Sequence, residues 1–146
     1  MELITERLES LKAGTISSLS LGVIFIITTL VNSLLLSKYW SILTYPSTTI
    51  VNLPIVLSGV IAGFSGFLFG VTYRYIIRND TNPHLRTGAV WAFGLIRGLT
   101  QIELGWNNSE VILPYLIMAG ESILWFAFAG FILNLAILHG WLKSFS

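Results

Sequence analysis

Three polar side chains lie deep inside long apolar stretches of the sequence, and they are the first candidates for chemistry: Arg97, Gln101 and Glu121. At 1.5 Å per residue, the distance from each stretch's start places Arg97 and Glu121 near the middle of a membrane. A lone charge at that depth costs at least about 2.5 kcal/mol. We therefore expect Arg97 and Glu121 to form an intramembrane polar pair, with Gln101 adding a hydrogen bond one turn away.

Two roles are open for this polar set. Ionisable groups inside a membrane often line a proton or ion path, and a small oligomeric transporter or channel subunit would use Arg97 and Glu121 in that way. A path normally needs polar groups at several successive depths, and few others are present here. We favour a structural or partner-binding pair and keep transport as the alternative. Replacement of Glu121 by Gln should then reduce assembly or abundance.

The sequence holds no recognisable catalytic constellation. It has no HExxH motif, no nucleophile paired with a base, and no phosphate-binding glycine loop. With no cysteine, disulfides and thiolate metal sites are excluded. We therefore predict a non-enzymatic protein with no metal and no cofactor; a pigment or haem at His84 or His139 is the alternative left open.

Glycines recur at helical spacing in two of the apolar stretches. Small residues on one helical face allow helix backbones to approach closely, which is how helices commonly associate in lipid. We expect both faces to pack against helices of this chain or of a partner. Their residues are Gly59, Gly63, Gly66 and Gly70 in one stretch and Gly94, Gly98 and Gly105 in the other.

Membrane helices are the elements that must position these residues. The chain has 146 residues, of which 54% are hydrophobic and 10% charged, against about 25% charged in a soluble domain. At about 20 residues per span, four spans fit. We predict an all-α, integral membrane four-helix bundle that forms one domain over residues 1–146. The spans are expected at about 13–36, 51–73, 86–105 and 111–138.

Two segments of this scheme differ from ordinary spans. The stretch 86–105 is the least apolar, so an alternative has three spans with this stretch lying flat on the surface. Residues 1–12 alternate apolar and charged side chains at near-helical spacing. That pattern predicts a short N-terminal amphipathic helix at the membrane surface.

The basic residues indicate the orientation, because loops rich in Lys and Arg stay cytoplasmic. A four-span chain would place both termini on the cytoplasmic or stromal side. Six of the eight basic residues fall on that side: Arg7, Lys12, Arg74, Arg78, Arg86 and Lys143.

The net charge of +1 gives no reason to expect nucleic acid as a partner. The expected partners are membrane lipid, other membrane-protein subunits or a second copy of this chain.

The sequence also predicts an internal repeat. Residues 11–19 align with 85–93, and residues 53–57 align with 113–117. Two hairpins that each cross twice share one orientation, so this would be a parallel duplication about an axis along the membrane normal. The alternative is that basic residues before a span and a proline at its start are generic signals.

A loop-plus-helix pattern runs through the middle of the chain. It comprises residues 69–75, Arg78-Asn79-Asp80, Asn82, Leu85-Arg86-Thr87-Gly88, Ala92-Phe93-Gly94-Leu95 and Arg97-Gly98. This pattern resembles a family of small, poorly characterised membrane proteins of cyanobacteria and chloroplasts. The resemblance implies a thylakoid or plasma membrane location and an auxiliary role in the biogenesis or organisation of photosynthetic complexes. It implies no active site.

These observations together predict a protein that acts through helix packing. We expect an assembly factor or accessory subunit of a larger membrane complex, which contacts its partners through the glycine-striped helix faces.

Overall fold

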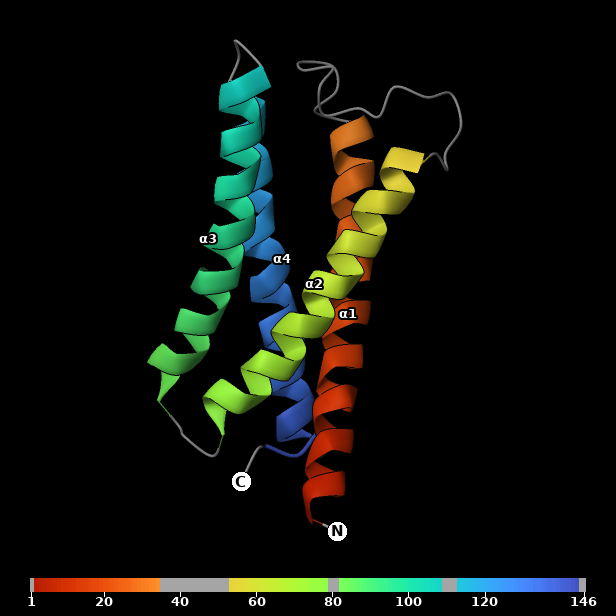
Figure 1. The fold of residues 1–146 in the computed structure, drawn as a ribbon, viewed down its shortest axis with the longest axis vertical. Coiled ribbons are helices and arrows are strands. Elements are labelled where there is room, and N and C mark those ends of the chain that lie inside the picture. The colour runs from red at the N-terminus through yellow and green to blue at the C-terminus, as the bar shows by residue number, and fades with distance from the viewer. Residues whose placement is uncertain (1, 35–52, 79–81, 109–112, 145–146) are drawn as a thin grey trace.

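The computed structural model describes residues 2–34, 53–78, 82–108 and 113–144 (Figure 1). The predicted all-α class is confirmed, and these described residues form four helices. The helices are α1 (Glu2–Leu34), α2 (Leu53–Ile77), α3 (Pro83–Asn108) and α4 (Leu113–Leu138).

Three of the helices are long and apolar enough to cross a membrane. The qualifying segments are Glu2–Asn32 in α1, Val56–Ile77 in α2 and Tyr115–Leu138 in α4. The 26 residues of α3 extend over about 39 Å, but this helix is not among the three. The prediction of a membrane protein is therefore supported, with α3 as the helix whose polarity sets it apart.

Helices that are neighbours in the sequence pack as two antiparallel pairs, α1 with α2 and α3 with α4 (Figure 1). Contacts between α1 and α4 join the pairs. In Figure 1, α2 crosses α1 at an angle, whereas α3 runs lengthwise beside α4. Both termini lie at the same end of the molecule.

Aromatic rings fill the region where α2, α3 and α4 meet. The ring of Phe69 is fully buried, and its centroid lies 5.2 Å from those of Phe93 and Phe126 and 5.3 Å from that of Tyr73. Tilted and edge-on ring pairs at such distances are favourable beyond the area that they bury. This cluster closes the centre of the fold at the level of Phe69.

The glycines of α2 lie against α1. A Cβ at Gly70 would fall in the space of the Ala13 carbonyl and 2.7 Å from the Cβ of Ser17. A Cβ at Gly66 would lie 3.0 Å from backbone atoms of α1. Gly63 and Gly59 follow the same face at ordinary contact distance. The stripe predicted on this helix thus makes a contact within the chain.

The glycines of α3 lie against α4 in the same way. A Cβ at Gly94 would be 2.9 Å from the Cα of Ile123, and one at Gly98 would be 3.1 Å from the carbonyl oxygen of Ala119. The surroundings of Gly105 are outside the part that the structure describes. Both stripes are therefore largely covered by the chain itself, so they are not free for a partner.

The first twelve residues do not form a separate surface helix. Helix α1 runs without a break over 33 residues, and its apolar side chains near the N-terminus, such as Leu3 and Leu8, are exposed. The polar side chains Glu6 and Ser10 instead face the other helices. The polar side chains of this segment are therefore divided. Ser10 and Glu6 meet a buried cation on α2, whereas Glu2, Arg7 and Lys12 are exposed.

The chain turns sharply after α4, which brings its last described residues back to α1 and α2. Gly140 has a φ of 77°, and Trp141 N donates to Ala136 O at 2.9 Å. This is the pattern of a Schellman cap, which glycine favours because it has no Cβ. Leu142 is thereby buried, and Lys143 follows it into the polar contacts described next.

The internal repeat stays a prediction. Gly14 and Gly88 occupy equivalent positions in the alignment, but their surroundings differ. A Cβ at Gly14 would lie 2.7 Å from the ring of Phe67, whereas one at Gly88 would meet nothing within 4 Å.

Candidate functional site

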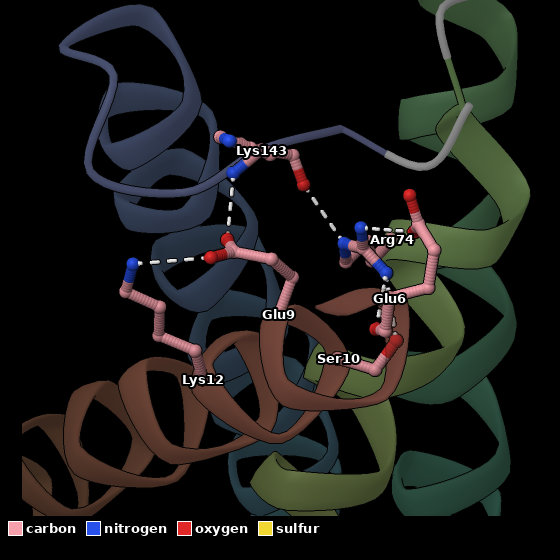
Figure 2. A network of polar contacts seen from close by, with 6 residues as sticks. All are labelled: Glu6, Glu9, Ser10, Lys12, Arg74 and Lys143. Atoms are coloured by element: carbon pink, nitrogen blue, oxygen red, sulfur yellow. Dashed lines mark hydrogen bonds and ion pairs between the residues drawn. The ribbon is translucent and has the colours of Figure 1, made fainter. Parts of the chain in front are cut away.

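Among the described residues, a network of polar contacts links the start of α1, the end of α2 and the segment after α4 (Figure 2). The side chain of Arg74, near the end of α2, is 1% exposed. Its NH1 donates to Ser10 Oγ at 2.8 Å and to Glu6 O at 3.0 Å, and its Nε donates to Lys143 O at 2.8 Å. The NH2 group forms an ion pair with Glu6 Oε2 at 2.5 Å.

A second carboxylate holds the C-terminal segment from the other side. Glu9 Oε2 accepts a hydrogen bond from Lys143 N at 2.9 Å, and Glu9 Oε1 pairs with Lys12 Nζ at 3.4 Å. Lys143 is thus held by its backbone N–H and by its carbonyl. We call this set the terminal clamp; it comprises Glu6, Glu9, Ser10, Lys12, Arg74 and Lys143.

The terminal clamp is a device that connects elements. A guanidinium carries its donors in a rigid fork, and here the fork reaches α1 through Glu6 and Ser10 and the C-terminal segment through Lys143. Because the charge is buried and paired, removal of one partner would leave the other uncompensated. The clamp therefore joins three parts of the chain, and its guanidinium is buried among these contacts.

The sequence did not indicate the terminal clamp. Arg74 and Lys143 were interpreted only as basic residues that set orientation. One signal could have found it: Glu6, Glu9 and Ser10 lie at i, i+3 and i+4, hence on one helical face.

The polar residues expected near mid-membrane are brought to one depth. The close approaches at Gly94 and Gly98 align this part of α3 with residues 119–123 of α4. Arg97 lies on that part of α3, and Glu121 lies opposite on α4. Arg97 and Glu121 therefore lie at one level along the pair of helices, and their depth in a membrane stays a prediction.

Glu121 and Arg97 each contact a residue that spacing did not indicate. Glu121 Oε2 accepts a hydrogen bond from Asn32 Nδ2 at 3.1 Å, which links α4 to α1. The guanidinium carbon of Arg97 lies 4.7 Å from the ring centroid of Trp125, a cation–π contact. Gln101 is half-buried one turn away. The expected ion pair between Arg97 and Glu121 stays a prediction.

The two histidines lie apart at the ends of helices. His84 is exposed in the first turn of α3, where its backbone N–H is capped by Asn82 Oδ1 at 3.0 Å. His139 follows α4, and its Nδ1 lies 2.9 Å from Leu135 O. Within the described ranges, no three His, Cys, Asp or Glu side chains gather as a metal site would require.

Comparison with known proteins adds no assignment. No family model matches the chain, and neither a curated protein nor a solved structure shows significant similarity to it. Function must therefore be argued from the contacts described above.

Proposed function

We propose that α3 is a fourth membrane span. Its polar side chains at positions 86, 97 and 101 are half-buried, whereas its outward side chains between positions 91 and 99 are apolar. Hydropathy averaged over all of its residues therefore underestimates how well its outer surface suits lipid. This outer stripe of α3 consists of Ala92, Leu95, Ile96, Leu99, Glu103 and Trp106, all exposed.

We further propose that both termini face the cytoplasm or stroma, within a four-helix bundle. The basic residues Arg7, Lys12, Arg78 and Lys143 belong to the end of the molecule that carries both termini. Loops rich in such residues are retained on the cytoplasmic side.

We infer that the protein is a non-enzymatic accessory subunit or assembly factor of a larger membrane complex. The observation that carries this proposal is that its polar groups tie helices together. The terminal clamp joins α1, α2 and the C-terminal segment, and Glu121 joins α4 to α1. Such ties hold the helices together while many large apolar side chains stay exposed along them. Exposed apolar helix faces are suited to contact with other membrane helices.

The contact face is the outer stripe of α3 in this proposal, because the glycine stripes are covered within the chain. Ile96 at its centre is 70% exposed and Trp106 is 76% exposed. Tryptophan is enriched among the residues that carry the binding energy of protein interfaces. The resemblance of residues 69–98 supports a thylakoid location and a photosynthetic complex as the partner.

Isolation of the tagged chain from its native membrane tests this function. We expect the wild-type protein, solubilised gently and run on a native gel, to migrate with the subunits of one large complex. Ile96→Trp should abolish that co-migration by adding bulk to the contact face.

The matched control is Leu19→Trp, since Leu19 is 68% exposed on α1 and lies outside the outer stripe. Co-migration that survives Ile96→Trp would contradict the contact face. Migration of the wild-type chain only as a homo-oligomer would contradict the accessory role and favour the transporter alternative.

A further inference from the structure

A groove opens on the surface between α3 and α4, outside the polar contacts described so far. It has a volume of about 400 Å³, within the range of sites that hold small ligands. Its polar lining residues are Tyr73, Arg86, Thr87 and Asn134. Val90, Ile123 and Ala127 belong to its apolar walls.

The polar end of the groove carries the positive charge of Arg86. Among the residues that the structure describes, none that lines the groove is acidic. Arg86 NH1 donates to Asn134 Oδ1 at 2.7 Å, while Arg86 Nε is buried with no hydrogen-bond partner among the described residues. A buried donor on a cation is costly to leave unsatisfied, so this end is suited to an anionic group with several acceptor oxygens.

The length of the groove matches one leaflet of a bilayer. Arg86 lies in the first turn of α3, and Ile123 packs against Gly94. Eight residues of helix separate these two levels, which is about 12 Å. Half of a hydrocarbon core is about 15 Å. The groove thus extends from the end that carries the termini to near the middle of the membrane.

We propose that this groove binds one anionic glycerophospholipid of the inner leaflet. Its phosphate accepts hydrogen bonds from Arg86, which suits phosphate geometry, and one acyl chain lies along Val90, Ile123 and Ala127. Basic pockets between membrane helices on the cytoplasmic side commonly bind anionic headgroups. The inference rests on α3 lying in the membrane beside α4 and does not depend on the accessory role.

Native mass spectrometry of the full chain, released from micelles with equal phosphatidylglycerol and phosphatidylcholine of the same acyl chains, tests this site. We expect one retained phosphatidylglycerol per chain, in preference to phosphatidylcholine. Arg86→Gln should weaken retention about tenfold, since a hydrogen bond to a charged group is lost. Arg78→Gln, which removes an exposed charge at the same end, should leave retention unchanged.

A second pair of variants tests the apolar wall and keeps the proposal testable if Arg86→Gln does not fold. Ala127→Phe should fill the groove and prevent retention, whereas Thr100→Phe, at an exposed position outside both the lining and the outer stripe, should not. Equal retention of phosphatidylglycerol and phosphatidylcholine would overturn the proposal. So would a loss of phosphatidylglycerol in Arg78→Gln as large as the loss in Arg86→Gln. So would a wild-type chain that carries a second copy of itself and no lipid.

Discussion

A buried guanidinium is stable only when acceptors match its N–H groups, and Arg74 shows how this chain provides them. Two of its acceptors are backbone carbonyls, and two are side chains of α1. Lysine has one terminal nitrogen and cannot reproduce this fork. The site therefore depends on the shape of the side chain as well as on its charge.

Substitution of Arg74 should be strongly destabilising. Arg74→Ala leaves Glu6 without its buried partner, and loss of one member of such a pair costs about 3–5 kcal/mol. The measurement is the free energy of unfolding in mixed micelles, followed by circular dichroism. Arg78→Ala, at an exposed position, should change it by about 0.5 kcal/mol or less. Full stability of Arg74→Lys would show that the charge alone suffices.

The hydrogen bond from Asn32 changes the expected effect of Glu121→Gln. A glutamine oxygen can still accept from Asn32 Nδ2, so we expect Glu121→Gln to preserve abundance, whereas Glu121→Leu should cost about 1–3 kcal/mol because it leaves a buried donor unsatisfied. The free energy of unfolding of each variant, alone and combined with Asn32→Ala, measures the coupling energy between Glu121 and Asn32. An abundant Glu121→Gln protein that had lost a transport activity would argue against a structural role.

At the level of elements, the fold depends on where helices approach closely. Gly70 faces a backbone carbonyl of α1, whereas Gly88 on α3 faces open space. Both are helical, so alanine improves local propensity at each by up to about 1 kcal/mol. Steric conflict should outweigh that gain only where the facing atoms are backbone atoms, which cannot move aside as a flexible side chain can.

We therefore expect opposite effects of the same substitution at these two glycines. Gly70→Ala should lower the free energy of unfolding by about 1–3 kcal/mol through overpacking, and Gly88→Ala should be neutral or slightly stabilising. The free energies of unfolding of the two variants can be compared by titration with a denaturing detergent under one set of conditions. Equal effects would mean that α1 and α2 separate easily, contrary to the contact described here.

At the level of the whole molecule, the path of α3 determines the topology. The absence of cysteine allows single introduced thiols to be labelled without background. We expect a membrane-impermeant maleimide to reach His84→Cys and Ser144→Cys from one side of sealed vesicles and Asn107→Cys from the other. Labelling of His84→Cys and Asn107→Cys from the same side would instead place α3 on the surface and leave three spans.

Much of the architecture could be predicted from local patterns in the sequence. Long apolar runs predict helices because hydropathy and backbone satisfaction in lipid are properties of each segment. The glycine spacing indicated contact faces because the helical period is set by the backbone. The predicted segment 86–105 lies within the helix Pro83–Asn108, although its polarity left its relation to the membrane open.

The partners of the polar side chains could not be predicted in this way. Arg74 was interpreted only as a basic residue that sets the orientation, and it is buried. Glu121 accepts a hydrogen bond from Asn32, which lies 89 positions away in the sequence, and no spacing indicated that contact. Which groups meet depends on how each helix is rotated and at what angle it crosses its neighbours. Those quantities come from the packing of the whole chain, so a sequence pattern places a residue on a face and at a depth, and tertiary packing selects its partner.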